Sequence, residues 1–145
     1  MIGLLQRVTR ASVSVDGETT GEIGRGLLVF VGVHRDDTEK DVGRLAERIL
    51  TYRVFPDSVG RMNRSVIDET AAILLVPQFT LAADTKKGTR ASFTRAAAPD
   101  TGERFFLQLI ELCRARLERV ETGQFGAHMQ VSLINDGPVT FWLES

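Results

Sequence analysis

The stretch Leu27-Leu28-Val29-Phe30-Val31-Gly32-Val33 is an almost unbroken apolar run, and it points to the fold class. A strand with one wet face alternates apolar and polar residues, whereas a strand covered on both faces is apolar along its whole length. The run therefore predicts a strand buried on both faces. A similar strand is expected from Ala71 to Val76, running on through Pro77.

The residues before this run predict a hairpin. Two segments, 2–9 and 11–15, alternate apolar and polar residues with the two-residue period of a strand. Asp16-Gly17 is a strong two-residue turn signal because both positions tolerate positive φ. The return strand is expected over Glu18 to Ile23. Because hairpin strands pair antiparallel, the sheet is predicted to be mixed.

Two helices are expected further along the chain. One follows Thr38, which forms a capping-box pattern with Asp41, and it should end near Tyr52. The other opens at Asp100 and is expected to stop at Gly123. The apolar stripe of the first helix is Val42, Leu45, Ala46, Ile49 and Leu50, and that of the second is Phe106, Leu109, Ile110, Cys113, Leu117 and Val120.

Two strands close the chain, Met129 to Ile134 and Val139 to Leu143, with a Gly-Pro step between them. No internal repeat or second domain is visible. The predicted fold is a single α/β domain over residues 1–145, with a mixed β-sheet that contains hairpins and packs with two main helices.

Composition narrows the class of protein. Apolar residues make up 43% of the 145 residues and charged residues 26%, which is ordinary for a soluble globular domain. A net charge of −1 argues against a general nucleic-acid coat protein but leaves room for a local basic patch. The single cysteine, Cys113, fits a reducing cytosol, and no signal peptide or membrane span is apparent. We expect a cytoplasmic protein with no membrane partner.

The usual catalytic groupings are missing from the sequence. Cys113 lies on the predicted helical stripe, which favours a buried core thiol over a nucleophile. His34 and His128 stand apart from each other and from any serine or cysteine partner, and we interpret both as structural. No metal-ligand spacing, nucleophile elbow or phosphate-binding loop is present, so no metal and no cofactor are expected.

Three features remain as candidates for function, and each has a simpler interpretation. Gln78-Phe79-Thr80-Leu81 follows a buried strand, where ligand sites are common, but it also fits a strand that turns Gln78 and Thr80 outward and Phe79 and Leu81 inward. The segment from Asp84 to Pro99 carries several cations that suit a phosphate backbone or simply a solvated loop. Gly137-Pro138 is a stiff corner with exposed carbonyls, or an ordinary tight turn.

Taken together, these segments resemble the D-aminoacyl-tRNA deacylases of the bacterial and eukaryotic type. The likeness covers essentially the whole chain. The matching segments are Met1 to Val13, Gly21 to Gly24, Gly26 to Leu28, Gln78 to Asp84, Met129 to Leu133, and Asn135 to Leu143.

The resemblance implies an enzyme that hydrolyses the ester of D-aminoacyl-tRNA, which is chiral proofreading in translation quality control. It implies a homodimer whose Gly137-Pro138 bond is cis, and whose corner enters the partner's pocket to exclude L-aminoacyl groups. Glycyl-tRNA, including glycine mischarged on tRNA(Ala), is expected to be hydrolysed as well. Hydrolysis is expected to use the RNA's own 2′-hydroxyl and main-chain groups that stabilise the oxyanion.

The resemblance also assigns residues. Gln78, Phe79 and Thr80 would line the adenosine and ester pocket, with Thr80 a weak candidate nucleophile because no base is visible. The residues implied in substrate binding and chiral selection, besides Gly137 and Pro138, are Phe125, Met129 and Arg7. Those expected to contact the tRNA backbone are Lys86, Lys87 and Arg90. Phe125 would stack on the adenine, although a core position suits it equally.

Two positions depart from the family pattern. Pro77 replaces the usual serine before the Gln-Phe-Thr segment and removes its hydroxyl and N–H. His128 stands where an acidic residue is common. Two rival functions stay open: a relaxed editor of small L-aminoacyl-tRNAs, and a non-catalytic module that binds the tRNA acceptor end.

Overall fold

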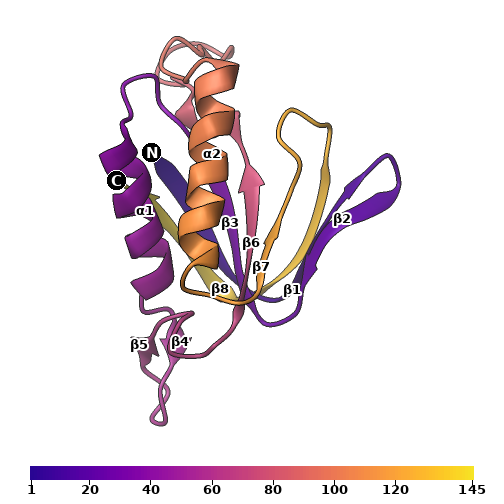
Figure 1. Ribbon diagram of the computed structural model, residues 1–145, viewed down its shortest axis with the longest axis vertical. Coiled ribbons are helices and arrows are strands. Elements are labelled where there is room, and N and C mark those ends of the chain that lie inside the picture. The colour runs from indigo at the N-terminus through magenta and orange to yellow at the C-terminus, as the bar shows by residue number, and fades with distance from the viewer.

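The computed structural model describes residues 1–145 as a sheet covered by helices (Figure 1). Its strands are β1 (Ile2–Val15), β2 (Glu18–Ile23), β3 (Gly26–Gly32), β4 (Phe55–Pro56), β5 (Met62–Arg64), β6 (Ala72–Pro77), β7 (Val120–Thr122) and β8 (Gln130–Glu144). Its helices are α1 (Glu39–Thr51), the short 3₁₀ helix η1 (Phe79–Ala82) and α2 (Pro99–Arg114). No helix is both long enough and apolar enough to cross a membrane.

The main sheet is mixed, as predicted. Its path is β2-β1-β3-β6-β7, and β8 adds to β1. The pairings of β3 with β6 and of β6 with β7 are parallel, whereas β1 pairs antiparallel with β2, β3 and β8. The small β4-β5 pair stands apart from this sheet. The Asp16-Gly17 turn is confirmed, with φ of 50° and 81° at its two positions.

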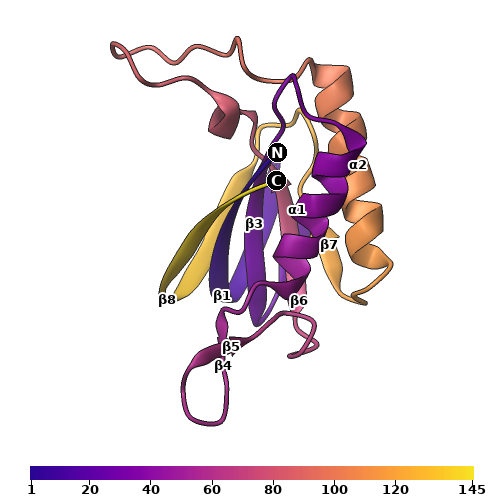
Figure 2. The ribbon, with the colours of Figure 1, turned by 90° about the vertical axis from the view of Figure 1, so that its left-hand side faces the viewer.

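The apolar run of β3 divides between two cores, which explains why it lacks polar residues. Leu27, Val29 and Val31 belong to the larger core with residues of α1 and α2, and both helices lie on one face of the sheet (Figure 2). Leu28 belongs to a second core on the opposite face, where the sheet curls and residues of β1, β2 and β8 cover it. Burial on both faces is therefore confirmed.

The end of the second helix differs from the prediction. α2 ends at Arg114, and the N–H of Ala115 donates to the carbonyls of Glu111 and Cys113. Leu117 follows the helix, and Val120 begins β7 beside Ile73. Both side chains join the same core as the helix, which is why they extend its apolar period.

The two C-terminal strands form one long strand, β8, along β1. The register shifts between Gln6 and Val8 and again between Val8 and Arg10. Gly137-Pro138 is thus an outward bulge within a single strand rather than a turn between separate strands.

The start of α1 supports a prediction about pH. The side chains of Thr38 and Asp41 form the expected capping box. The main-chain N–H of Thr38, followed by its hydroxyl, lowers the pKa of Asp41 from 3.8 to about 2. Asp41→Ala is expected to lower the free energy of unfolding at pH 7 by about 1 kcal/mol, the usual contribution of a cap.

The sign of this effect follows from the lowered pKa. Stabilisation by the Asp41 carboxylate is fully present well above pH 3.8 and is lost as the pH falls toward 2. Denaturant unfolding at both pH values measures it, with Asp36→Ala as the control because Asp36 is an exposed loop carboxylate. An Asp41→Ala deficit of the same size at pH 7 and pH 2 would contradict the assignment.

Candidate active site

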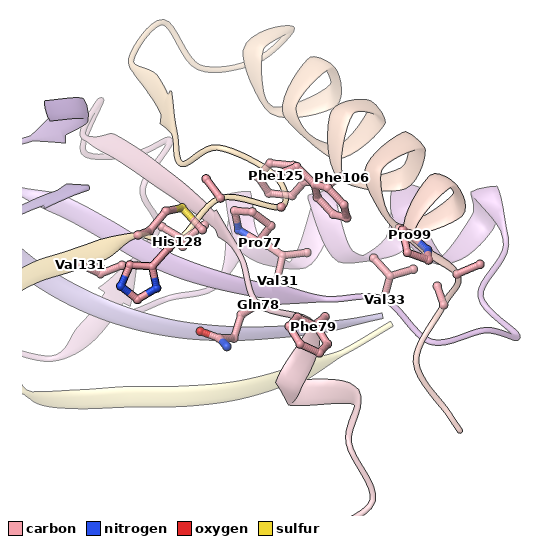
Figure 3. A pocket seen from close by; sticks show the side chains of 17 residues that line it. Val31, Val33, Pro77, Gln78, Phe79, Pro99, Phe106, Phe125, His128 and Val131 are labelled. Atoms are coloured by element: carbon pink, nitrogen blue, oxygen red, sulfur yellow. The ribbon is translucent and has the colours of Figure 1, made fainter. Parts of the chain in front are cut away.

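A cavity of about 450 Å³ opens at the carboxyl ends of the parallel strands β3 and β6 (Figure 3). Open α/β sheets commonly bind ligands at this edge. The start of α2 and the segment between β7 and β8 form the other walls. The lining residues are Val31, Val33, Val76, Pro77, Gln78, Phe79, Ala97, Ala98, Pro99, Gly102, Phe106, Phe125, Gly126, Ala127, His128, Met129 and Val131.

The wall on the α2 side is aromatic. The rings of Phe106 and Phe125 lie 6.3 Å apart between centroids, with an angle of 40° between their planes. Gly102 leaves room for this arrangement, since a Cβ there would lie 3.4 Å from the Phe125 ring. Phe125 lines the cavity and also packs against the larger core, so the two positions foreseen for it coincide.

Met129 forms part of the opposite wall. Its Sδ accepts a hydrogen bond from the N–H of Gln124 at 3.4 Å. Gly123 has a packing role here, because a Cβ at that position would lie 2.8 Å from Met129 Sδ and 3.4 Å from Pro77 Cδ. The prediction that Gly123 ends a helix was therefore wrong, and it is instead the residue that admits Met129 and Pro77 beside it.

Gln78 to Leu81 is not the alternating strand considered as an alternative. The N–H of Gln78 donates to the carbonyl of Val31, and the chain then turns into η1. Phe79 is 62% exposed at the cavity rim. The Gln78 amide donates to the Thr80 hydroxyl, and Thr80 lies outside the cavity lining.

The two departures from the family pattern both face this cavity. Pro77 ends β6 opposite Val31 and contributes its ring to the wall. His128 is the one ionisable side chain among the lining residues. Apart from His128 and the amide of Gln78, the lining has no polar side chain, and a mostly apolar lining with a few polar groups is typical of a small-molecule pocket.

The Gly137-Pro138 corner does not line the cavity of its own chain. Both residues are exposed, and the peptide bond between them is cis. The side chain of Asn135 spans the base of the bulge, because its amide donates to the Val139 carbonyl at 2.9 Å and its oxygen accepts from the Val139 N–H at 2.9 Å.

Arg7 anchors the corner to the body of the domain. Its Nε donates to the Asp136 carbonyl at 2.9 Å, and its Nη1 donates to the Val54 carbonyl at 2.6 Å. The Asp136 carboxylate lies 3.3 Å from the same Nε. Arg7 therefore lies with Gly137 and Pro138 rather than with Gln78, Phe79, Phe125 and Met129.

The predicted backbone-binding cations lie on a segment outside the sheet. Lys86, Lys87 and Arg90 are exposed and form no ion pair within the chain. Cys113, in contrast, is buried in the larger core, and burial raises the pKa of its thiol to about 12. The interpretation of Cys113 as a core thiol is confirmed.

Most apolar wall residues, among them the aromatic Phe106, were not assigned to the site from the sequence, and neither was the rim contact between Phe79 and Phe93. Phe106 was placed on a helical core stripe, and it is buried in the core while also reaching the cavity. No sequence signal separates these two roles. The rings of Phe79 and Phe93 lie 5.1 Å apart between centroids. The exposed aromatic in a basic loop was the available signal for this contact.

Comparison with known proteins gives consistent matches over the whole chain. A family model described as "D-Tyr-tRNA(Tyr) deacylase" matches residues 4–144. A protein of Alkalilimnicola ehrlichii named "D-aminoacyl-tRNA deacylase" is 63% identical, over 100% of this chain and 97% of its own length. A protein of the same name from Escherichia coli O9:H4 is 56% identical, over 99% of each chain.

Solved structures show the same fold. One described as "c-Myc DNA Unwinding Element Binding Protein" superposes with a TM-score of 0.95 at 43% identity, covering 100% of this chain and 99% of the other. Another, described as a "probable eukaryotic D-amino acid tRNA deacylase", has a TM-score of 0.85 at 18% identity, covering 99% and 98%. At that identity the second match shows the fold alone.

Proposed function

Because this chain belongs to the D-Tyr-tRNA(Tyr) deacylase family and is a D-aminoacyl-tRNA deacylase, we propose that two copies build each complete site. The cavity of one copy takes the terminal adenosine and its aminoacyl ester. The Gly137-Pro138 corner of the other copy closes the site and excludes L-aminoacyl groups. The products are free D-amino acid and tRNA.

The observation that supports this proposal is that the Gly137-Pro138 corner lies apart from the cavity of its own chain. Gly137 and Pro138 are exposed, yet neither lines the cavity of their own chain. A second copy is the simplest source of the missing wall. The free edge of β8 offers a surface for it, since this strand pairs only with β1 and exposes Ile134 and Trp142, at 46% and 50%. Exposed apolar side chains of this size are typical of interfaces.

The stereochemistry follows from the corner being main chain. Its carbonyl groups would face the α-carbon of the bound aminoacyl group, so an L side chain meets the backbone and a D side chain points away. Selectivity of this kind comes from a clash with the wrong substrate and does not read side-chain type. Glycine has no side chain to clash, so glycyl-tRNA, including glycine on tRNA(Ala), is expected to be hydrolysed too.

The chemistry is assigned to the substrate and the main chain. Water adds to the ester carbonyl, the bond from the carbonyl carbon to the ribose 3′-oxygen breaks, and that oxygen takes a proton as the carboxylic acid leaves. In this proposal the vicinal 2′-hydroxyl of the ribose would relay this proton, and main-chain groups around Gln78 and Phe79 would stabilise the oxyanion. Thr80 is assigned an assisting role only, because its hydroxyl accepts from Gln78 and no general base adjoins it.

The test is stereochemical deacylation. We expect D-tyrosyl-tRNA to release tyrosine while L-tyrosyl-tRNA survives with the same enzyme concentration and time. Equal cleavage of both esters, or preferred cleavage of L-alanyl-tRNA, would support the relaxed editor. Binding of both tRNAs without cleavage would support the acceptor-end binding module.

A further inference from the structure

Two exposed aromatic rings meet at the rim of the cavity. Phe79 is 62% exposed and Phe93 is 44% exposed, and their centroids lie 5.1 Å apart with 44° between the ring planes. Phe79 lines the cavity mouth, whereas Phe93 lies outside the lining. The pair therefore extends the aromatic surface of the cavity outward onto the protein surface.

Main-chain hydrogen bonds hold Phe93 in place. Asp84 and Ser92 exchange two of them, from the N–H of Asp84 at 2.8 Å and from the N–H of Ser92 at 3.0 Å, and so close the loop just before Phe93. The carbonyl of Phe93 accepts from Ala96 N–H at 3.0 Å, and the N–H of Ala97 donates to Val33 beside the cavity at 3.0 Å. The exposed ring thus stands on a backbone tied to the site.

Unpaired cations lie on the loop that directly precedes Phe93. The loop closed by Asp84 and Ser92 carries Lys86, Lys87 and Arg90, and none of these forms an ion pair within the chain. Asp84 supplies the one carboxylate of the segment, and it caps the N–H of Lys86. Figure 2 shows the segment extending away from the sheet. Exposed aromatic rings together with a cationic segment are the elements that bind single-stranded nucleic acid.

We propose that Phe79 and Phe93 form a stacking subsite for the base of the nucleotide that precedes the terminal adenosine. The inference rests on the proposed function, which puts that adenosine in the cavity. The 3′ end of tRNA is single-stranded, so its bases are free to stack on side chains. Its phosphates would then pass the loop cations, which supply attraction without base specificity.

The experiment compares two small esters, D-tyrosyl-adenosine and D-tyrosyl-CpA. The quantity measured is kcat/KM for D-tyrosyl-CpA divided by kcat/KM for D-tyrosyl-adenosine. This ratio isolates the contribution of the extra nucleotide to catalysis. Stacking of one base on an aromatic side chain corresponds to about 5- to 150-fold in affinity, so we expect a ratio in that range for the parent protein. Phe93→Ala is expected to lower this ratio at least about 5-fold, leaving only the attraction of the extra phosphate to the loop cations.

Three variants separate stacking from simple apolar packing. Phe93→Trp keeps a flat ring and is expected to keep the ratio, whereas Phe93→Leu keeps bulk alone and is expected to lose it. Leu107→Ala is the control, because Leu107 is also an exposed apolar residue, 53% exposed, but lies on α2 outside the cavity lining. A ratio that survives in Phe93→Ala, or that Phe93→Leu retains, would overturn the proposal.

A binding measurement keeps this test independent of hydrolysis. Calorimetric titration with CpCpA that carries no amino acid, and with adenosine, gives the affinity of each ligand. The ratio of the two affinities is then compared between the parent and the variants. Failure to hydrolyse either ester would count against the proposed function, while the CpCpA titration of Phe93→Ala still decides the subsite. Equal affinities of parent and variant for CpCpA would refute it.

Discussion

Gly137→Ala is expected to lower kcat/KM for D-tyrosyl-tRNA by about 100-fold, the usual cost of misplacing a catalytic element by about 1 Å. A Cβ at Gly137 would lie 2.0 Å from the Val139 nitrogen and 2.9 Å from Asn135 Oδ1. Neither neighbour can move easily, because they are hydrogen-bonded to each other across the base of the bulge. The backbone of the corner must therefore shift. This shift moves the carbonyl groups that are proposed to face the substrate.

Folding should be far less affected than activity. The corner is exposed, and the two β8 segments on either side of it pair with β1 independently. Gly24→Ala is the matched control, because that glycine is also exposed and a Cβ there meets nothing within 4 Å. Steady-state kinetics and thermal unfolding of both variants measure the effect. Parent-like activity in Gly137→Ala would remove the corner from the site.

Mixing subunits tests whether the corner acts across the interface. Ala127→Trp places an indole in the cavity lining and is expected to block it. If corner and cavity come from different subunits, a mixed dimer of Gly137→Ala and Ala127→Trp has one site built from two intact parts. Random mixing then restores about a quarter of the parent activity, since about half of the dimers are mixed and each has one working site of two. No recovery after mixing would place corner and cavity in the same subunit.

The long strands of the main sheet were predictable because burial leaves a direct mark on the sequence, whereas the short strands β4, β5 and β7 were not predicted. β3 and β6 are identified by composition, because they are apolar on both faces. The β1-β2 hairpin is identified by its turn, because Asp16-Gly17 tolerates the positive φ that the turn needs. The end of α2 was not predictable in this way. Leu117 and Val120 continue the apolar period because they enter the same core, although the chain there has left the helix.

Site residues were predictable where they directly follow a strand. They were not predictable where only tertiary packing brings them to the site. Gln78 and Phe79 follow β6 directly, so the strand end indicated them. Gly123 looks the same in sequence whether it ends a helix or makes room for Met129, and only the 2.8 Å approach to Met129 Sδ distinguishes the two. The contact between Phe79 and Phe93 depends on how a long loop folds back, which no local pattern specifies.

Arg7→Ala is expected to affect both stability and catalysis, because Arg7 joins the corner to the interior. Its Nη1 satisfies the carbonyl of Val54, a fully buried residue, and its Nε holds the Asp136 carbonyl next to Gly137. Loss of a charged donor from a buried acceptor costs about 1–3 kcal/mol in the free energy of unfolding. Denaturant unfolding measures this term, with Arg44→Ala on the exposed face of α1 as the control.

The effect of Arg7→Ala on stereoselectivity shows whether Arg7 positions the corner or only stabilises the fold. A corner released from Arg7 would hold its carbonyls less firmly, so the ratio of D- to L-tyrosyl-tRNA cleavage should fall, an effect that lower stability alone does not produce. Arg7→Lys sharpens the test, because one ammonium group cannot reproduce the fork in which Nε and Nη1 reach two different carbonyls. We expect it to retain the charge but to lose selectivity nearly as Arg7→Ala does. A lysine variant with full stereoselectivity would show that charge beside Asp136, rather than the fork, positions the corner.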